Sequence, residues 1–202
     1  MKRIAIFDYG AGNLHSIVKA ISADDRDIFV EADLRLAMKA DILVLPGVGA
    51  FSSATDAMRS AQPDLRSALL DGLPCIGICL GMQLLFDSSD EGAGHGIGLI
   101  QGTAVRLRTS KVPHIGWNSI DWAETANGQG SRDLRLAYFA NSYVCEAEDE
   151  SRILAWTTHQ DQRFPAVVRR ANAVGVQFHP EKSSVAGRAF VNLLIEELVE
   201  CR

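Results

Sequence analysis

Short apolar runs alternate with helical stretches through the first half of this chain, and this alternation limits the possible folds more than any other feature. Three apolar runs bounded by Gly, Pro or Asp predict buried strands at residues 3–7, 41–45 and 74–78. The stretches with helical spacing lie at residues 13–23, 51–60, 64–70 and 80–86. Strand followed by helix, repeated, predicts an α/β fold with an open, mostly parallel sheet flanked by helices.

The second half of the chain has a different pattern. Strand-like runs occur at residues 104–107, 119–122, 135–139, 153–157, 166–169 and 174–178, which predicts additional antiparallel or mixed strands. A final amphipathic helix is expected over residues 185–199, with Ser183 or Ser184 as its N-cap. Two polar stretches, residues 87–98 and 123–132, are expected to be surface loops.

Length and charge limit the architecture and the partners. With 202 residues the chain is long enough to bury a core, and one domain over residues 1–202 is expected. A formal net charge of -5 and the lack of a long Lys/Arg block argue against nucleic acid or an anionic membrane as the main partner. No apolar run is long enough to span a membrane and no signal peptide is present, so we expect a cytoplasmic location.

One of the four cysteines lies in a sequence typical of a nucleophile. The cysteines form no C-x-x-C pair and no zinc-finger spacing, which argues against a disulfide framework or structural zinc. Gly77-Ile78-Cys79-Leu80-Gly81, however, follows a predicted strand and opens a predicted helix, as does the G-x-S-x-G nucleophile elbow. Such a turn exposes the Cys79 thiol at the sheet edge, near a helix N-terminus that favours the thiolate. The alternative is a small buried hydrophobe, the fate expected for Cys75.

A base and its orienting carboxylate follow another predicted strand. Alternate residues of an extended segment point the same way, so His179 and Glu181 can share one face. Pro180 restrains His179 to extended backbone, and a carboxylate beside the ring fixes its tautomer. An isolated His-Pro-Glu is more often a strand-end histidine with a solvated glutamate. Together with Cys79, each at the end of a predicted strand, the pattern favours a Cys-His-Glu triad.

Two glycine-rich turns follow other predicted strands. Gly47-Val48-Gly49 permits unusual backbone angles, and a Val48 or Gly49 amide together with the Leu80 amide could stabilise an oxyanion; an ordinary strand-to-helix turn is the alternative. The turn from Asp8 begins like a dinucleotide fingerprint, but His15 replaces its third glycine, so nucleotide binding is disfavoured. The remaining histidines share no metal-ligand spacing, and no metal site is predicted.

Several strings together resemble the class I, triad-type glutamine amidotransferases, which have a flavodoxin-like fold, and more closely the branch that serves histidine biosynthesis as the glutaminase subunit of imidazole glycerol phosphate synthase. The resemblance covers nearly the whole chain. The strings are D-Y-G-A-G-N-L (8–14), P-G-V-G-A-F (46–51), G-I-C-L-G-M-Q (77–83), P-H-I-G-W-N (113–118) and Q-F-H-P-E-K-S (177–183).

The resemblance implies roles for further residues. The residues that it implies for glutamine binding are Gly47, Gly49, Gln83, Ser142 and Tyr143, and those for the oxyanion are the amides of Val48 and Leu80. Asn13, Trp117 and Lys182 are implied to face a partner subunit. The chain departs from the family at Asn141, where the family usually carries His before the Ser/Thr-Tyr pair. That departure leaves the triad unchanged, but any role that the family's His has at this position in gating or partner contact does not carry over to Asn141.

The resemblance also implies a reaction and a partner. L-glutamine is hydrolysed to glutamate and ammonia through a cysteine thioester, with no metal or organic cofactor. The ammonia passes to a separate (β/α)8-barrel cyclase, which forms imidazole glycerol phosphate and AICAR. The alternatives are an amidotransferase subunit for anthranilate, aminodeoxychorismate or pyridoxal phosphate synthesis, a Cys-His peptidase of related fold, and a regulatory subunit with an inactive site.

Overall fold

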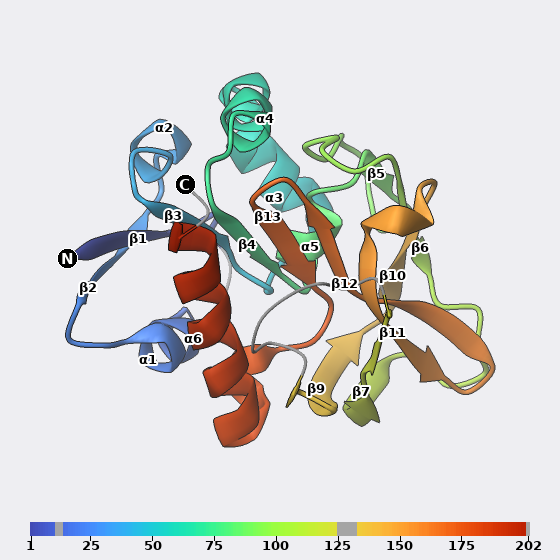
Figure 1. Cartoon of the computed structure of the whole chain (residues 1–202). Coiled ribbons are helices and arrows are strands. Elements are labelled where there is room, and N and C mark those ends of the chain that lie inside the picture. Colours follow the sequence, from blue (N-terminus) through green and yellow to red (C-terminus); the bar gives the residue numbers. More distant parts are fainter. Residues whose placement is uncertain (11–13, 125–132, 201–202) are drawn as a thin grey trace.

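The computed structural model describes residues 1–10, 14–124 and 133–200, and its centre is a twisted sheet of eight strands (Figure 1). In spatial order the strands are β2 (Arg26–Glu31), β1 (Lys2–Phe7), β3 (Ile42–Leu45), β4 (Cys75–Ile78), β13 (Ala173–Val176), β12 (Gln162–Arg170), β11 (Ile153–His159) and β8 (Asp121–Trp122). The strands from β2 to β13 pair in parallel, whereas β12, β11 and β8 pair antiparallel. The predicted α/β class is therefore confirmed.

Helices cover both faces of the parallel part of the sheet, because alternate side chains of each strand point to opposite faces. Ile4 and Ile6 of β1 pack in a core cluster with α1 (His15–Ile21) and α6 (Ser184–Glu200). Ala5 and Phe7 pack in the other cluster. The helices that contribute to that second cluster are α2 (Leu34–Ala37), α3 (Phe51–Met58), α4 (Gln62–Leu70) and α5 (Leu80–Gln83).

Two smaller sheets and two 3-10 turns complete the described fold. One sheet contains β10 (Tyr143–Ala147), β6 (Gly102–Arg106) and β5 (Ser88–Ser89), and the other pairs β7 (His114–Ser119) with β9 (Leu136–Asn141). The 3-10 turns are η2 (Glu150–Arg152) and η3 (Pro180–Lys182). Figure 1 shows β7 and β9 beside the antiparallel end of the main sheet, away from β1 and β2.

Several predicted boundaries were wrong. The helix expected over residues 80–86 ends at Gln83, and the strand expected at residues 119–122 is divided between the end of β7 and β8. The loop expected at residues 87–98 contains β5. Ser183 does not cap α6 with its hydroxyl, because Ser183 Oγ donates to the His179 carbonyl and accepts from the Tyr138 amide. Residues 125–132 of the second expected loop lie outside the described residues.

Several described elements were not predicted, among them the short helix α2 and the strands β2, β7 and β10. β2 is an edge strand whose sequence, Arg-Asp-Ile-Phe-Val-Glu, has charges at both ends and is only partly buried, so it lacks the apolar run expected of a central strand. β7 exposes alternate residues and contains a glycine, which weakens the usual strand signal. In each case tertiary pairing, rather than local propensity, determines the strand.

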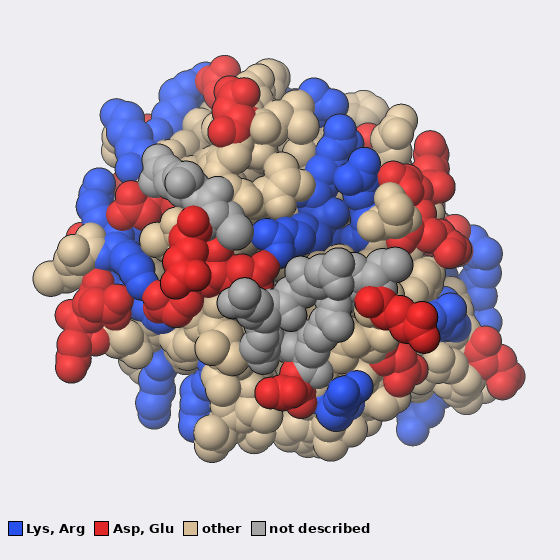
Figure 2. Space-filling model, in the orientation of Figure 1, with Lys and Arg blue, Asp and Glu red and all other residues tan. Residues whose placement is uncertain are grey.

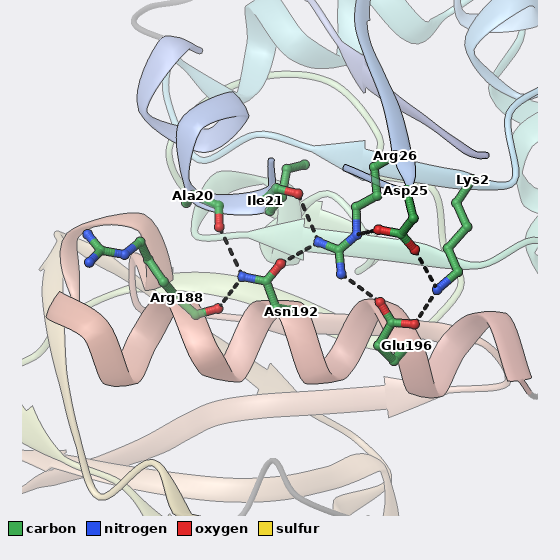
Figure 3. Close-up of polar contacts among 8 residues, drawn as sticks. All are labelled: Lys2, Ala20, Ile21, Asp25, Arg26, Arg188, Asn192 and Glu196. Carbon is green, nitrogen blue, oxygen red and sulfur yellow. Dashed lines mark hydrogen bonds and ion pairs between the residues drawn. The ribbon is translucent and has the colours of Figure 1, made fainter. Parts of the chain in front are cut away.

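A polar network joins the last helix to the first two strands (Figure 3). The Arg26 side chain is only 4% exposed, and its guanidinium donates to the Ile21 carbonyl at 2.8 Å and to Glu196 at 2.7 Å. Arg26 also donates to the side chain of Asn192, and Lys2 donates to Glu196. α6 is thereby fixed against β1, β2 and the end of α1, so its apolar face stays on the sheet.

We expect Arg26→Ala to lower the free energy of unfolding by about 2–3 kcal/mol, because it leaves a buried carbonyl and the Asn192 and Glu196 side chains without their donor. Urea unfolding at neutral pH measures this change. Arg59→Ala is the control: Arg59 is 77% exposed and pairs with Asp56 one helical turn away, so about 0.5 kcal/mol or less is expected. Equal losses in the two variants would show that the network adds no stability of its own.

Candidate active site

Three neighbouring strands end at one edge of the main sheet and carry the candidate catalytic groups. The Gly47–Gly49 segment follows β3, Cys79 follows β4, and His179 lies shortly after β13. These strands are adjacent and parallel, so their carboxyl ends meet. Open α/β sheets bind ligands at this edge. The topology therefore brings together segments that lie far apart in sequence, such as Gly47 and His179.

Cys79 occupies a strained turn between β4 and α5. Its backbone angles are φ 48° and ψ −102°, in a region that residues with a side chain rarely adopt. Its amide donates to the Val176 carbonyl at 2.7 Å, which fixes the turn to β13. A Cβ added to Gly81 would lie 2.0 Å from the Leu45 carbonyl oxygen, and one added to Gly77 would lie 2.5 Å from the Gly81 carbonyl oxygen. Only glycine permits the chain to turn this tightly from β4 into α5 and lets α5 lie this close to β3.

The structure places Cys79, His179 and Glu181 together. His179 is 3% exposed, and its Nδ1 lies 2.8 Å from Glu181 Oε1. Burial alone lowers the pKa of His179, but hydrogen bonds to Cys79 and Glu181 outweigh burial and raise that pKa to about 9. The imidazole therefore favours its charged form between the Cys79 thiol and the Glu181 carboxylate, an arrangement that can shuttle a proton to and from a nucleophile.

Backbone contacts fix the orientation of the histidine. The His179 amide donates to the Tyr138 carbonyl at 2.9 Å. The Ser183 hydroxyl donates to the His179 carbonyl at 2.7 Å and accepts from the Tyr138 amide at 2.9 Å. β9 and η3 therefore hold the base from both sides. Two of the groups that hold His179 lie within the next four residues of the chain. Glu181 contacts the ring, and Ser183 contacts the backbone carbonyl.

Gln177 also contacts the thiol, a contact that the sequence analysis missed. Its Nε2 donates to Cys79 Sγ at 3.5 Å, and its Oε1 is buried without a hydrogen bond to the described residues. Because Gln177 lies two residues before His179 in an extended segment, the period-2 argument that paired His179 with Glu181 could have included it. Gln177 therefore places a hydrogen-bond donor beside the candidate nucleophile.

A cavity of about 230 Å3 opens beside Cys79. Its lining includes six residues that the sequence analysis had singled out, Gly47, Gly49, Leu80, Gln83, Ser142 and Tyr143. Val48, the other oxyanion candidate, lies between two lining residues and is not itself part of the lining. Ala140 and Asn141 line the cavity as well. The thiol, the two glycines and the β9–β10 segment thus enclose one small polar space.

Glu91 also lines this cavity and supplies its only carboxylate among the described lining residues. Its Oε2 accepts from the Phe51 amide at 3.0 Å, which holds the side chain at the start of α3. The sequence analysis missed Glu91, because the residue lies in a polar, glycine-rich stretch without periodicity or motif. Only the three-dimensional structure brings it near Cys79.

The loop after β3 packs directly against the triad. A Cβ added to Gly47 would lie 3.0 Å from Cys79 Cβ and 3.1 Å from His179 Cε1. Gly49 has φ 111°, a conformation that favours glycine. The buried Tyr9 hydroxyl donates to the Pro46 carbonyl, which ties the end of β1 to this loop. Substitution of either glycine would therefore disturb the loop, the triad or both.

The candidate partner residues have different positions. Trp117 of β7 is 50% exposed, and its ring lies edge-on to the Tyr138 ring of β9 at 6.2 Å. Lys182 is exposed in η3, next to Glu181. Asn13 lies outside the described residues.

The described cysteines other than Cys79 have no polar role in this site. Cys75 is fully buried, and burial raises its pKa to about 12; burial also raises the pKa of Cys145 well above its usual range.

Residues 1–10, 14–124 and 133–200 contain no group of three or more His, Cys, Asp or Glu side chains that could hold a metal ion. Within the same residues, no helix has the length and apolarity required to cross a membrane.

Known proteins provide an independent comparison. A family model described as glutamine amidotransferase class-I matches residues 5–196. The chain is 36% identical to the imidazole glycerol phosphate synthase subunit HisH of Lactococcus lactis, with 98% of this chain and 100% of that protein covered. It is 42% identical to HisH of Zymomonas mobilis, with 96% and 95% covered. The chain is a class I glutamine amidotransferase of the HisH family. The family predicted from the motifs is thus confirmed.

Solved structures of amidotransferases share the fold. One described as a glutamine amidotransferase superimposes with a TM-score of 0.75 at 15% identity and 98% coverage of both chains. PurLQS from Thermotoga maritima gives a TM-score of 0.72 at 16% identity, with 99% of both chains covered. At such low identity the likeness supports the class I amidotransferase fold, in agreement with the family assignment.

We expect kcat/KM for glutamine hydrolysis to fall as the pH rises through about 9, because His179 then loses the proton that it must give to the departing ammonia. Glu181→Gln removes the charge and the charge-assisted hydrogen bond that raise the pKa of His179 and leaves at most a neutral acceptor, so the alkaline limb should move to lower pH. Steady-state rates of wild type and variant between pH 6 and 10 test this expectation. An alkaline limb at the same pH in both would contradict the role given to Glu181.

The same pKa shift makes a prediction about stability. His179 has a higher pKa in the folded than in the unfolded chain, so its contribution is fully present below about pH 6.5 and is lost as the pH rises through about 9. Wild type should therefore lose more stability than Glu181→Gln over that interval.

Proposed function

We propose that the chain hydrolyses L-glutamine to L-glutamate and ammonia and delivers the ammonia to a separate cyclase for the formation of imidazole glycerol phosphate and AICAR in histidine biosynthesis. The observation that carries the proposal is the buried Cys79–His179–Glu181 constellation beside a polar cavity, in a chain of the HisH family. The proposed unit is one glutaminase domain over residues 1–202, and the proposed location is the cytoplasm.

Acylation begins with the thiolate of Cys79. It attacks the side-chain carbonyl carbon of glutamine and forms a C–S bond, and the carbonyl electrons move to oxygen. When the tetrahedral intermediate collapses, His179 gives its proton to the departing ammonia, and a glutamyl thioester remains on Cys79. Glu181 orients the ring and stabilises its positive charge, but it transfers no proton itself.

Deacylation uses the same base. His179, now neutral, removes a proton from water, whose oxygen attacks the thioester carbonyl. Collapse of the second intermediate breaks the C–S bond, releases glutamate and returns the thiolate with a protonated His179. Both half-reactions thus use groups of the chain together with water.

The cavity offers partners for both ends of glutamine. The substrate's α-ammonium requires an acceptor, and we assign it to Glu91, the one carboxylate among the described lining residues. Gln83, Ser142 and Tyr143 supply further polar groups around the substrate, and Gly47 and Gly49 let it approach the backbone. A cavity of about 230 Å3 has room for a small amino acid such as glutamine.

The oxyanion is assigned to the backbone amides of Val48 and Leu80. Leu80 directly follows the nucleophile, as the second donor does in other nucleophile elbows. Val48 lies between two glycines, so its peptide can rotate at low cost. One missing oxyanion donor costs on the order of 10²–10³ in kcat. A rearrangement of Gly47–Gly49 is therefore sufficient to switch the rate.

The acceptor of ammonia is assigned to a second chain, a (β/α)8-barrel cyclase, because the relatives are named as one subunit of a synthase. The proposed contact is the exposed apolar face of β7 and β9, where Ile115, Trp117 and Leu136 are 60%, 50% and 51% exposed. Lys182 and Asn13 are proposed to belong to the same interface. Figure 2 shows both acidic and basic side chains on the side of the molecule turned toward the viewer in Figure 1.

We expect Cys79→Ala to abolish glutamate release while the assembled complex keeps its synthesis from added ammonium salts, because only ammonia generation uses the thiolate. Cys75→Ala and Cys145→Ala are the matched controls and should retain turnover if they fold, as both are buried hydrophobes. Glutamate release with glutamine and proteolysis of a generic peptide mixture should be assayed in parallel. Normal glutamine turnover by Cys79→Ala would refute the assignment, and cleavage of peptides by wild type would favour a peptidase.

We expect the isolated chain to hydrolyse glutamine slowly, and the cyclase with its nucleotide ligand to raise kcat much more than it lowers KM. The reason is that hydrolysis without an acceptor wastes glutamine, and that one rotated peptide at Val48 suffices to hold the rate down. Glutamate release should be measured for the chain alone, with the cyclase, and with the cyclase plus its nucleotide. Equal kcat in all three would leave an unregulated glutaminase.

A further inference from the structure

Two buried polar residues face each other across the ribbon formed by β7 and β9. His114 and Asn141 are directly opposite in its register, and they are 4% and 5% exposed. Asn141 lines the cavity beside Cys79, whereas His114 does not. The His114 ring stacks between Phe139 at 5.0 Å and His159 at 4.2 Å. Packing thus holds the His114 ring in place immediately behind the wall of the cavity.

The hydrogen bonds of Asn118 determine the tautomer of His114. Asn118 Nδ2 donates to the Thr158 carbonyl at 2.8 Å and lies 3.3 Å from His114 Nε2. An amide nitrogen cannot accept, so Nε2 must be the acceptor. A neutral His114 then carries its proton on Nδ1.

The carbonyl of Tyr143 determines the orientation of the Asn141 amide. Asn141 Nδ2 donates to this carbonyl at 3.0 Å, and Gln83 Nε2 donates to it at 3.3 Å. If the Asn141 amide were turned over, two oxygens would face each other at that position. Asn141 Oδ1 must therefore point away from Tyr143.

Two buried atoms are left over by these assignments, Nδ1 of His114 and Oδ1 of Asn141. Neither has a hydrogen bond of ordinary geometry within the described parts of the chain. One is a donor in the assigned tautomer and the other an acceptor, and they belong to residues that face each other. Pairing them satisfies both, as buried polar groups require.

The ionisation of His114 agrees with this pairing. Burial and the neighbouring His159 lower the pKa of His114 to about 4, while hydrogen bonding to Asn141 opposes them. His114 is therefore neutral at physiological pH, as the assigned tautomer requires.

We propose that His114 is a positioning residue for glutamine binding: its Nδ1–H donates to Asn141 Oδ1 and thereby fixes the Asn141 amide and the Tyr143 carbonyl in the cavity wall. The inference rests on the proposed function, because it takes this cavity as the glutamine site. His114 contacts neither substrate nor thiol. Its loss therefore weakens glutamine binding and leaves the chemical step at Cys79 intact.

The test compares two isosteric replacements. The amide nitrogen of asparagine occupies the position of Nδ1, so His114→Asn keeps a donor toward Asn141. The amide nitrogen of glutamine reaches the position of Nε2, so His114→Gln loses that donor. Steady-state glutamate release by the full chain should show KM raised about 5–30-fold for His114→Gln, within about 2-fold of wild type for His114→Asn, and similar kcat in all three. His159→Phe, which keeps a ring against His114, is the matched control and should leave KM unchanged.

A double-mutant cycle with Asn141→Ala completes the experiment. His114→Gln should raise KM no further in the Asn141→Ala background, because the two residues act through one bond. Equal KM values for His114→Asn and His114→Gln, additive effects in the cycle, or a loss confined to kcat would overturn the proposal. If His114→Gln does not fold, as judged by thermal unfolding, His114→Phe replaces it in the cycle. Absence of glutamine hydrolysis by wild type would instead refute the proposed function.

Discussion

The strained turn at Cys79, between β4 and α5, is the constraint on which the rest of the site depends. A residue with a side chain at φ 48° and ψ −102° stores on the order of 1–3 kcal/mol of strain, so the surrounding structure must impose that conformation. Three features do so: the parallel pairing of β4 with β3 and β13, the bond from the Cys79 amide to Val176, and the two glycines that let α5 pass against β3. The large apolar core on both faces of the sheet supplies the stability that offsets this strain.

Once the turn is fixed, the electrostatic surroundings of His179 determine its protonation. Burial of His179 disfavours its charge, whereas its contacts with Cys79 and Glu181 favour it, and the contacts prevail. A buried imidazolium is tolerated only between such partners, because an unpaired buried charge would cost several kcal/mol. The site is therefore stable as a unit. Removal of either partner therefore changes the protonation of His179 as well as its position.

Local rules predicted those parts of the site that lie within single motifs. The elbow glycines and the alternation from His179 to Glu181 follow from backbone geometry, and the apolar runs of β1, β3 and β4 follow from burial on both faces. The same rules could not predict the strands β2 and β7 or the place of Glu91 and Asn141 in the cavity wall. These features arise from contacts between segments that are distant in sequence. The length of α5 was overestimated, since the apolar residues after Gln83 are buried by packing rather than by helical periodicity.

The ribbon of β7 and β9 joins the proposed partner face to the catalytic base. On its exposed side the Trp117 ring lies against the Tyr138 ring, and the Tyr138 backbone is bonded to the His179 amide and to Ser183. The same β9 strand ends at Asn141 in the cavity wall. Both hydrogen bonds involve the backbone of Tyr138 and join short segments, so a shift of β9 moves the imidazole relative to Cys79. A misplacement of about 1 Å can cost on the order of 10² in rate. A contact at this face therefore needs no long pathway to affect catalysis, because a single residue of β9 separates it from the base.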